Sequence, residues 1–309
     1  MAVESIKNRR SSSTFIIKKA FIDSYVLLKA RINAWATYDL ATNMTIFLLL
    51  LYPGDQWYIQ RPVVILGIAG LLFREIQKSE WFWFVISIVL LAGYYQNWPT
   101  TDNHKWLLVY WCIAIYFSTK SKDKDKYLAI NGRLLIGLAF TFATFWKLVS
   151  SDFLDGTFFH YSLLMDDRFS SIAAIFSSVE TPMFVQNRRL LESLLHYEST
   201  ISWIQLQDTM LTVIVAKGLT LWTILIEGAI ALLFLLPQYY RLARWRDAIL
   251  LLFILTTYSI APVVGFGWLL TIMGAAQSNP STSINRIAYI AVFFLIQIYL
   301  IPWRLILGL

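Results

Sequence analysis

Two charged residues lie inside apolar stretches of the sequence. Lys147 ends the run FTFATFWK, and Glu227 lies near the middle of LTLWTILIEGAIALLFLL. Because burial disfavours the charged form of either group, Lys147 must reach an aqueous boundary, pair with a carboxylate or lose its proton. A lysine that has lost its proton can act as a general base. We expect Glu227 to face the interior of a helical bundle, as a buried hydrogen-bonding group, a proton relay or a ligand contact.

The three histidines form a second set of candidate side chains. His104, His160 and His196 all fall on the outer side of the predicted membrane, by the topology given below. Histidine and carboxylate groups are common metal ligands, and four aspartates lie near them in the sequence, namely Asp152, Asp155, Asp166 and Asp167. The spacing fits no compact metal-binding motif. We therefore predict no metal site and interpret the histidines as interfacial groups with hydrogen-bond partners.

The elements that position these groups are indicated by the composition. Of the 309 residues, 58% are hydrophobic and 15% are charged, whereas average chains are about half apolar and about a quarter charged. This balance excludes a soluble enzyme and a disordered chain. The one cysteine, Cys112, excludes a disulfide-rich secreted module. The composition predicts an all-α polytopic integral membrane protein, in which the net charge of +7 favours contact with lipid over nucleic acid.

The apolar runs predict about eight transmembrane helices. Run 209–236 has no turn signal, so we predict one helix there rather than a hairpin. Pro262, Gly265 and Gly267 interrupt the seventh run, where local unwinding is expected. The eight predicted helices cover roughly residues 39–52, 62–73, 81–95, 106–118, 134–149, 209–236, 248–273 and 287–302.

The basic residues predict the orientation of these helices. With the N-terminus and C-terminus both inside, the inner segments hold about three times as many Lys and Arg residues as the outer segments. Arg286 is among the residues expected outside. Residues 14–36 alternate apolar and basic positions at helical spacing, which is typical of an amphipathic helix on the inner leaflet. We therefore divide the chain into a cytoplasmic segment, 1–38, and a transmembrane domain, 39–309.

Two connections stand out. Residues 119–133 are expected to form a solvated cytoplasmic loop, because they are charged and have no apolar period. Residues 150–208 form an outer loop of about sixty residues, which is far longer than ordinary connections. Its segments SSIAAIFSS and SLLHYES resemble short helices on the membrane surface. Tryptophans such as Trp146 near the span ends indicate an interfacial belt, and some could line a pocket for a flat apolar ligand such as a quinone.

Two motifs carry a family resemblance. In the segment KLVSSDFLDG, 147–156, a Lys-Leu pair closes a span and an acidic, aromatic and glycine stretch follows. The segment NHKWLL, 103–108, places an Asn-His pair at the outer start of a preceding span. Both resemble motifs of the HTTM family, the horizontally transferred transmembrane proteins related to the membrane domain of vitamin K-dependent gamma-carboxylase. The order and number of predicted spans also fit.

The resemblance implies a quinol-coupled enzyme of the carboxylase or epoxidase type. Its cofactor would be reduced vitamin K, a quinone of the menaquinol type. Lys147 would be the base that deprotonates the hydroquinone, with Asn103 and His104 near the quinone. We add further candidates around this site, with Trp146 and His160 as quinone contacts and Asp152, Asp155 and Glu227 as supporting residues.

Two other functions stay open, because the seventh run has no histidine where the family has a Phe-His motif. The first is a non-enzymatic scaffold or complex subunit that binds a partner protein through the outer loop. The second is a transporter that uses Glu227, Lys217 and the interrupted seventh run. For all three, the expected location is the bacterial inner membrane.

Overall fold

The computed structural model describes residues 27, 30, 32, 34–54, 56–179, 181–196, 205–261, 263–278 and 283–299. These residues form helices and connections without a β-strand, so the prediction of an all-α protein is confirmed. Most of the predicted amphipathic helix at 14–36 lies outside the described residues.

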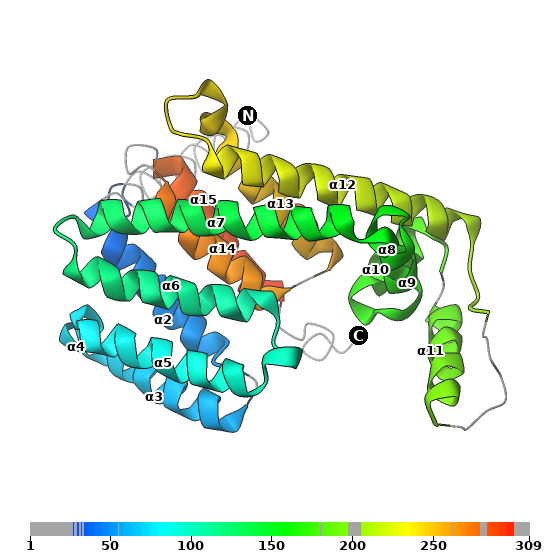
Figure 1. Ribbon diagram of the computed structural model, residues 1–309, viewed down its shortest axis with the longest axis horizontal. Coiled ribbons are helices and arrows are strands. Elements are labelled where there is room, and N and C mark those ends of the chain that lie inside the picture. Colours follow the sequence, from blue (N-terminus) through cyan, green and yellow to red (C-terminus); the bar gives the residue numbers. More distant parts are fainter. Residues whose placement is uncertain are drawn as a thin grey trace, which may run out of the picture.

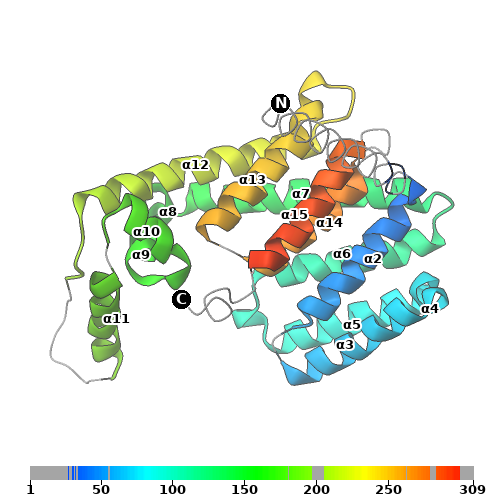
Figure 2. The ribbon, with the colours of Figure 1, turned by 180° about the vertical axis from the view of Figure 1, so that it is seen from behind.

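Among the described residues, nine helices build the main bundle, which is seen from opposite sides in Figures 1 and 2. Their shared core is apolar and largely aromatic, with Trp83, Trp111 and Trp268 fully buried. The nine helices are α2 (Thr37–Leu51), α3 (Trp57–Leu72), α5 (Glu80–Gln96), α6 (Asn103–Lys120), α7 (Lys124–Val149), α12 (Met210–Leu235), α13 (Arg246–Ile260), α14 (Val264–Gln277) and α15 (Ser283–Tyr299).

Short helices complete the described chain. The connection between α3 and α5 holds α4 (Arg74–Lys78), and 3-10 turns lie at Trp98–Thr100 and Arg241–Trp245. The expected outer loop folds into α8 (Ser151–Leu154), α9 (Thr157–Met165), a 3-10 turn at Asp167–Phe169, α10 (Ser170–Phe176) and α11 (Thr181–His196).

Two long helices match the apolar runs differently. The prediction of one uninterrupted helix over 209–236 is confirmed by α12, whose N-terminus is capped where the Thr209 hydroxyl accepts a hydrogen bond from the Thr212 amide. The prediction of a loop over 119–133 is wrong, because α7 begins at Lys124. The Asp123 carboxylate accepts a hydrogen bond from the Lys126 amide and starts the helix there. Charged residues form the first turns because helix formation does not require apolar periodicity at an exposed end.

The expected interruption of the run 248–273 is present, since α13 ends at Ile260 and α14 starts at Val264, but the expectation that this run makes a single crossing is wrong. The two helices form a hairpin. The far ends of the hairpin lie together, because the Gln277 amide donates to the Asp247 carboxylate. Gly265 and Gly267 let α14 approach its neighbours closely, since a Cβ at either position would overlap the ring of Tyr52 or Tyr258.

This hairpin adds one crossing of the bundle. The N-end of the bundle is defined here by the starts of α2, α7, α13 and α15. Tyr38 donates its amide to the Asp125 carboxylate, and Arg286 donates to the Trp35 carbonyl and the Thr37 hydroxyl. Arg286 therefore lies at the N-end and not at the opposite end, where the single seventh helix would have put it. By the same parity, α15 runs away from the N-end. The described part of the chain therefore ends at the opposite end of the bundle from the start of α2, which does not fit the expectation of eight spans with both termini on the inner side.

The outer helices, which lie beside the first half of α12 in Figure 1, have a small core of their own. Phe153, Phe159 and Phe169 pack against Leu163 and against Ala216 of α12. The segment SSIAAIFSS does contain a short helix, α10, as expected. We call α8 to α11 with their connections the outer region.

Helix α12 belongs to both cores. Gly137 of α7 faces Leu235 of α12, and Thr144 faces Gly228, so the two helices are antiparallel. Helix α7 ends near the level of Glu227, which Lys147 contacts. The first half of α12 continues past α7 by roughly 25 Å and packs on α9 and α10 (Figure 1). Both helices are long and apolar enough to cross a membrane, and α2, α3 and Ile284–Ile298 are shorter apolar helices.

Candidate functional site

A cavity of about 970 Å³ lies between α6 and α7, away from the N-end. Most of its wall is apolar and aromatic, and a few polar groups converge on it, as in ligand sites generally. Glu227 reaches the cavity from α12, and Phe266 closes it from α14. We call this space the aromatic cavity. It is lined by Asp102, Asn103, His104, Trp106, Leu107, Tyr110, Leu135, Leu138, Ala139, Phe140, Phe142, Ala143, Trp146, Lys147, Ser150, Phe153, Glu227 and Phe266.

The central polar feature of the aromatic cavity is an ion pair. The Lys147 Nζ atom lies 2.5 Å from the Glu227 Oε2 atom, and the two side chains are 21% and 8% exposed. Of the three alternatives for Lys147, the structure therefore has the pairing with a carboxylate. The lysine also lies in the last turn of α7, where the helix dipole favours a positive charge.

The backbone explains why these two residues meet. Because α7 and α12 are antiparallel, the last turn of α7 lies beside the middle of α12. Glu227 is buried among these helices as the sequence predicted. The Lys147 ammonium also lies 5.4 Å from the centroid of the Phe153 ring, a cation–π contact. Phe153 belongs to α8, so the outer region supplies part of the environment of the lysine.

The Asn-His pair lies at the start of α6, on the same cavity. Asn103 is the first residue of α6, and His104 follows it. The His104 ring is 6.3 Å from the centroids of both Tyr52 and Phe266. The structure therefore brings Asn103 and His104 to the cavity that Lys147 and Glu227 line.

Aromatic rings form the open wall of the cavity. Tyr110, Phe142 and Trp146 line it and are more than half exposed. Trp146 also contacts the Phe145 ring, with centroids 5.9 Å apart. A flat apolar molecule could stack on this wall without displacing a charged group.

Three of the expected site residues lie outside the cavity lining. His160 Nε2 pairs with Asp208 Oδ2 at 2.8 Å on the outer region. The Asp155 carboxylate accepts a hydrogen bond from the amide of Thr157, the first residue of α9, and hydrogen bonding with Thr157 holds the pKa of Asp155 below its ordinary value. The Asp152 carboxylate lies 3.4 Å from the Ser151 hydroxyl. Among the described residues, no group of three metal-ligating side chains occurs.

Sequence reasoning missed the pairing of Lys147 with Glu227. The two residues are 80 positions apart, and their partnership depends on the register of two helices. A signal was nevertheless available, since each charge interrupts an apolar run and each requires a partner of opposite sign. Phe266 was also missed, because it lies just after the break between α13 and α14.

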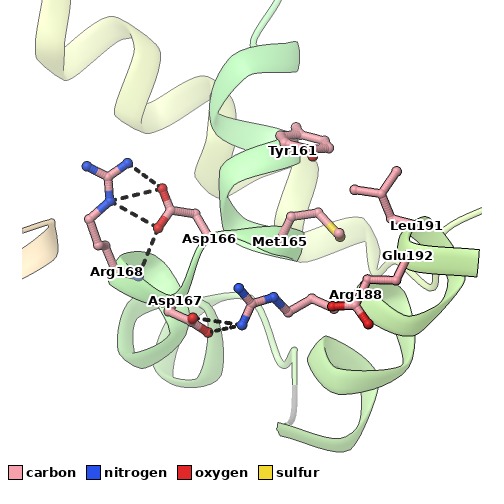
Figure 3. Close-up of a pocket in the computed structure, with 8 residues that line it drawn as sticks. All are labelled: Tyr161, Met165, Asp166, Asp167, Arg168, Arg188, Leu191 and Glu192. Carbon is pink, nitrogen blue, oxygen red and sulfur yellow. Dashed lines mark hydrogen bonds and ion pairs between the residues drawn. The ribbon is translucent and has the colours of Figure 1, made fainter. Parts of the chain in front are cut away.

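A second pocket, of about 550 Å³, lies wholly in the outer region (Figure 3). We call it the outer pocket. Arg168 binds both carboxylate oxygens of Asp166, and Arg188 binds both of Asp167. The hydrogen bonds from Arg168 hold the pKa of Asp166 below its ordinary value. The guanidinium groups already face carboxylates, so this pocket is a weaker candidate than the aromatic cavity.

Comparison of the chain with protein-family models, curated proteins and solved structures finds no match.

Proposed function

We propose that the chain is a polytopic membrane protein whose aromatic cavity binds a reduced quinone of the menaquinol type. The observation that supports this most is the buried Lys147–Glu227 pair on the wall of an otherwise apolar, aromatic cavity. Asn103 and His104 on the same cavity agree with the resemblance to the HTTM and vitamin K-dependent carboxylase proteins. The reaction would be a quinol-coupled oxidation of the carboxylase or epoxidase type.

The ion pair would accept the proton of a quinol hydroxyl. The pair as a whole is neutral when it holds one shared proton, either as ammonium with carboxylate or as amine with carboxylic acid. Uptake of a second proton gives the pair a charge of +1 beside the deprotonated ligand oxygen. The attraction between these opposite charges is strong in an apolar site. When bound, the quinol would supply the oxidisable ring.

The other cavity residues would bind and orient the ring. The side-chain amide of Asn103 and the imidazole of His104 can hydrogen-bond to quinol oxygens. Tyr110, Phe142 and Trp146 would stack on the ring or on its isoprenoid tail. Because these three rings are exposed along helices α6 and α7, their outer sides would contact lipid.

The membrane placement follows from the helices. We assign nine crossings, α2, α3, α5 to α7 and α12 to α15, with the N-end inside. Helix α14 is only about 21 Å long by its rise, compared with a hydrocarbon core of about 30 Å. It is buried within the bundle, so neighbouring helices rather than lipid satisfy its ends. A bacterial inner membrane is the location that we propose.

Binding of a partner protein is a second candidate function. The outer region exposes large apolar side chains, among them Phe158, Tyr161, Ile175 and Phe176. A scaffold would use this surface and would not need the aromatic cavity. Co-purification of a stoichiometric partner that protects residues 150–208 from proteolysis would favour this function.

The decisive experiment compares two lysines at the same end of the bundle. The protein is placed in nanodiscs with reduced menaquinone, O2 and labelled bicarbonate, and quinol oxidation is measured. We expect Lys147→Met to lower the rate by about 100-fold or more, which is typical of removing a general base. Lys217→Met removes the same charge from an exposed site that does not line the cavity and should leave the rate unchanged. Equal rates for the two variants would overturn the role of Lys147.

A further inference from the structure

A third pocket lies at the N-end of the bundle, remote from the aromatic cavity. Its volume is about 350 Å³, and it lies where the start of α7 meets the end of α12 and the end of α14. Lys126 and Arg133 of α7 face it together with Gln238 and Gln277. Lys126 and Arg133 are seven residues apart, which puts them on one face of the helix. We call this space the basic pocket.

In the portion of the chain that the structure describes, the cations of the basic pocket have no ion pair with a carboxylate. The described lining residues include no Asp or Glu. The Nε atom of Arg133 is buried and has no hydrogen-bond partner within the described part of the chain. A buried donor without an acceptor is costly, so the site favours a ligand that supplies an acceptor oxygen.

The surroundings of the pocket increase its positive potential. Arg246 lies close enough to Arg133 for the two charges to repel. The Arg246 guanidinium donates hydrogen bonds to the carbonyl oxygens of Leu233 and Leu236. Because carbonyl groups carry no net charge, these bonds leave the positive charge of Arg246 in place. Of the carboxylates nearby, Asp123 accepts the Lys126 amide at the start of α7, and Asp247 is half-buried and is engaged by other groups. Asp247 accepts hydrogen bonds from the side chains of Gln277, Asn285 and Tyr289.

We propose that the basic pocket binds a phosphate group, presented by the headgroup of an anionic phospholipid. Arginine and lysine are the side chains that bind phosphate oxygens most strongly, by charge-assisted hydrogen bonds. The amide group of Gln238 can add a hydrogen bond to the headgroup, whereas the amide nitrogen of Gln277 already donates to Asp247 and Gly274. Lipid as the source rests on the proposed membrane placement, with the N-end on the inner, anionic leaflet. It does not depend on quinol binding.

The connection between α12 and α13 supports a lipid source. It places Tyr239, Tyr240 and Trp245 on the surface beside the pocket, all of them exposed. Exposed aromatic residues next to basic residues are typical of a membrane interface. A phosphate held by Lys126 and Arg133 would therefore lie at the level where headgroups lie.

The test is native mass spectrometry of the full chain in detergent with added phosphatidylglycerol. We expect retained lipid, and a loss of affinity of about tenfold or more in Arg133→Gln. Arg133→Lys, which keeps the charge, should retain part of the affinity and shows that the position tolerates substitution. The matched control is Lys122→Gln, which removes one charge from an exposed residue just before α7. Equal retention by Arg133→Gln and Lys122→Gln would overturn the site.

A second arm separates the two sources of phosphate. Inorganic phosphate at millimolar concentration should compete weakly with retained phosphatidylglycerol in the wild type and not at all in Arg133→Gln. Phosphatidylcholine, which has no net charge, should not be retained at this site. Binding of inorganic phosphate without retention of phosphatidylglycerol would overturn the lipid source. The two proposals are tested separately, because Arg133 does not line the aromatic cavity. Arg133→Gln should lose phosphatidylglycerol and still oxidise quinol at the normal rate.

Discussion

The aromatic cavity and the outer pocket both contain ion pairs, but in opposite environments. Lys147 and Glu227 are 21% and 8% exposed and are surrounded by apolar and aromatic groups. Arg188 and Asp167 of the outer pocket are 46% and 67% exposed (Figure 3). The same kind of contact therefore has different consequences in the two regions. In the cavity each charge depends on its partner, whereas in the outer pocket water can replace either one.

This difference explains which pair could do chemistry. A pair shielded from water can change its protonation state in response to a ligand, because the ligand is the strongest local influence. A solvated pair is screened by water and salt, so a ligand changes it little. Burial, rather than residue type, distinguishes the candidate site from the surface.

The largest predicted effect follows from breaking the buried pair. Glu227→Leu leaves the Lys147 ammonium without its carboxylate and should lower the free energy of unfolding by about 3–5 kcal/mol. Denaturant unfolding in detergent measures this change in the free energy of unfolding. The double variant Lys147→Met with Glu227→Leu removes both charges and should recover most of the loss. If the double variant is as unstable as Glu227→Leu, the pair is not the cause of the destabilisation.

The second prediction concerns the outer region as a whole. Phe159 packs its ring against Phe153, Phe158 and Phe169, with centroids 5.2 to 5.9 Å apart. Phe159→Ala should destabilise α9 and α10 by roughly 3 kcal/mol, through lost burial and a cavity. Hydrogen exchange should accelerate in α9 and α10 and stay unchanged in the first half of α7. Acceleration throughout α7 would mean that the two cores unfold together.

Breaking the exposed pair should have a smaller effect. Arg188→Ala removes the partner of Asp167 and should cost about 0–1 kcal/mol, and less at high salt. Denaturant unfolding at low and high salt measures it. Arg189→Ala is a control, since the structure records no ion pair for that neighbouring arginine among the described residues. A loss of stability as large as that of Glu227→Leu would mean that the exposed pair and the buried pair do not differ in their contribution to folding.

The smallest effect is a response to acid. Because Arg168 holds the pKa of Asp166 below its ordinary value, the contribution of this carboxylate is fully present above about pH 3.9. It is lost as the pH falls through the lower pKa of the folded state. The contribution of Asp166 should therefore leave the protease sensitivity of the outer region constant from neutral pH down to about pH 3.9, and the sensitivity should rise at lower pH. Asp166→Asn should show a smaller rise, and an identical acid response would exclude Asp166 as its source.

Much of the bundle could be predicted from apolar runs, because a helix that packs in a bundle must hide its apolar face. Helix α12 was predicted closely, since nothing in 209–236 favours a turn. The break between α13 and α14 could not be predicted as a hairpin. A proline within an apolar run is compatible with a kinked helix as well as a turn. Whether the chain kinks or turns back depends on the close packing of Gly265 on Tyr52 and of Gly267 on Tyr258. These contacts join separate helices and are not visible in the local sequence.

The candidate site was predictable only in part. The two motifs indicated Lys147, Asn103 and His104, and the structure places all three on one cavity. His160 was an equally reasonable candidate, but its partner Asp208 lies in the outer region. Distances between residues far apart in the sequence depend on helix register, which the apolar period alone does not determine.

Because α12 runs without a break through both cores, it fixes the directions in which its side chains point in one core relative to the other. Ala216 packs in the outer core and Glu227 faces Lys147, and an uninterrupted helix joins them. One residue inserted between them would turn Glu227 by about 100° relative to Ala216. The outer region and the aromatic cavity could then not both keep their contacts. The number of residues between these two positions is therefore part of the architecture of the site, although none of them lines the aromatic cavity.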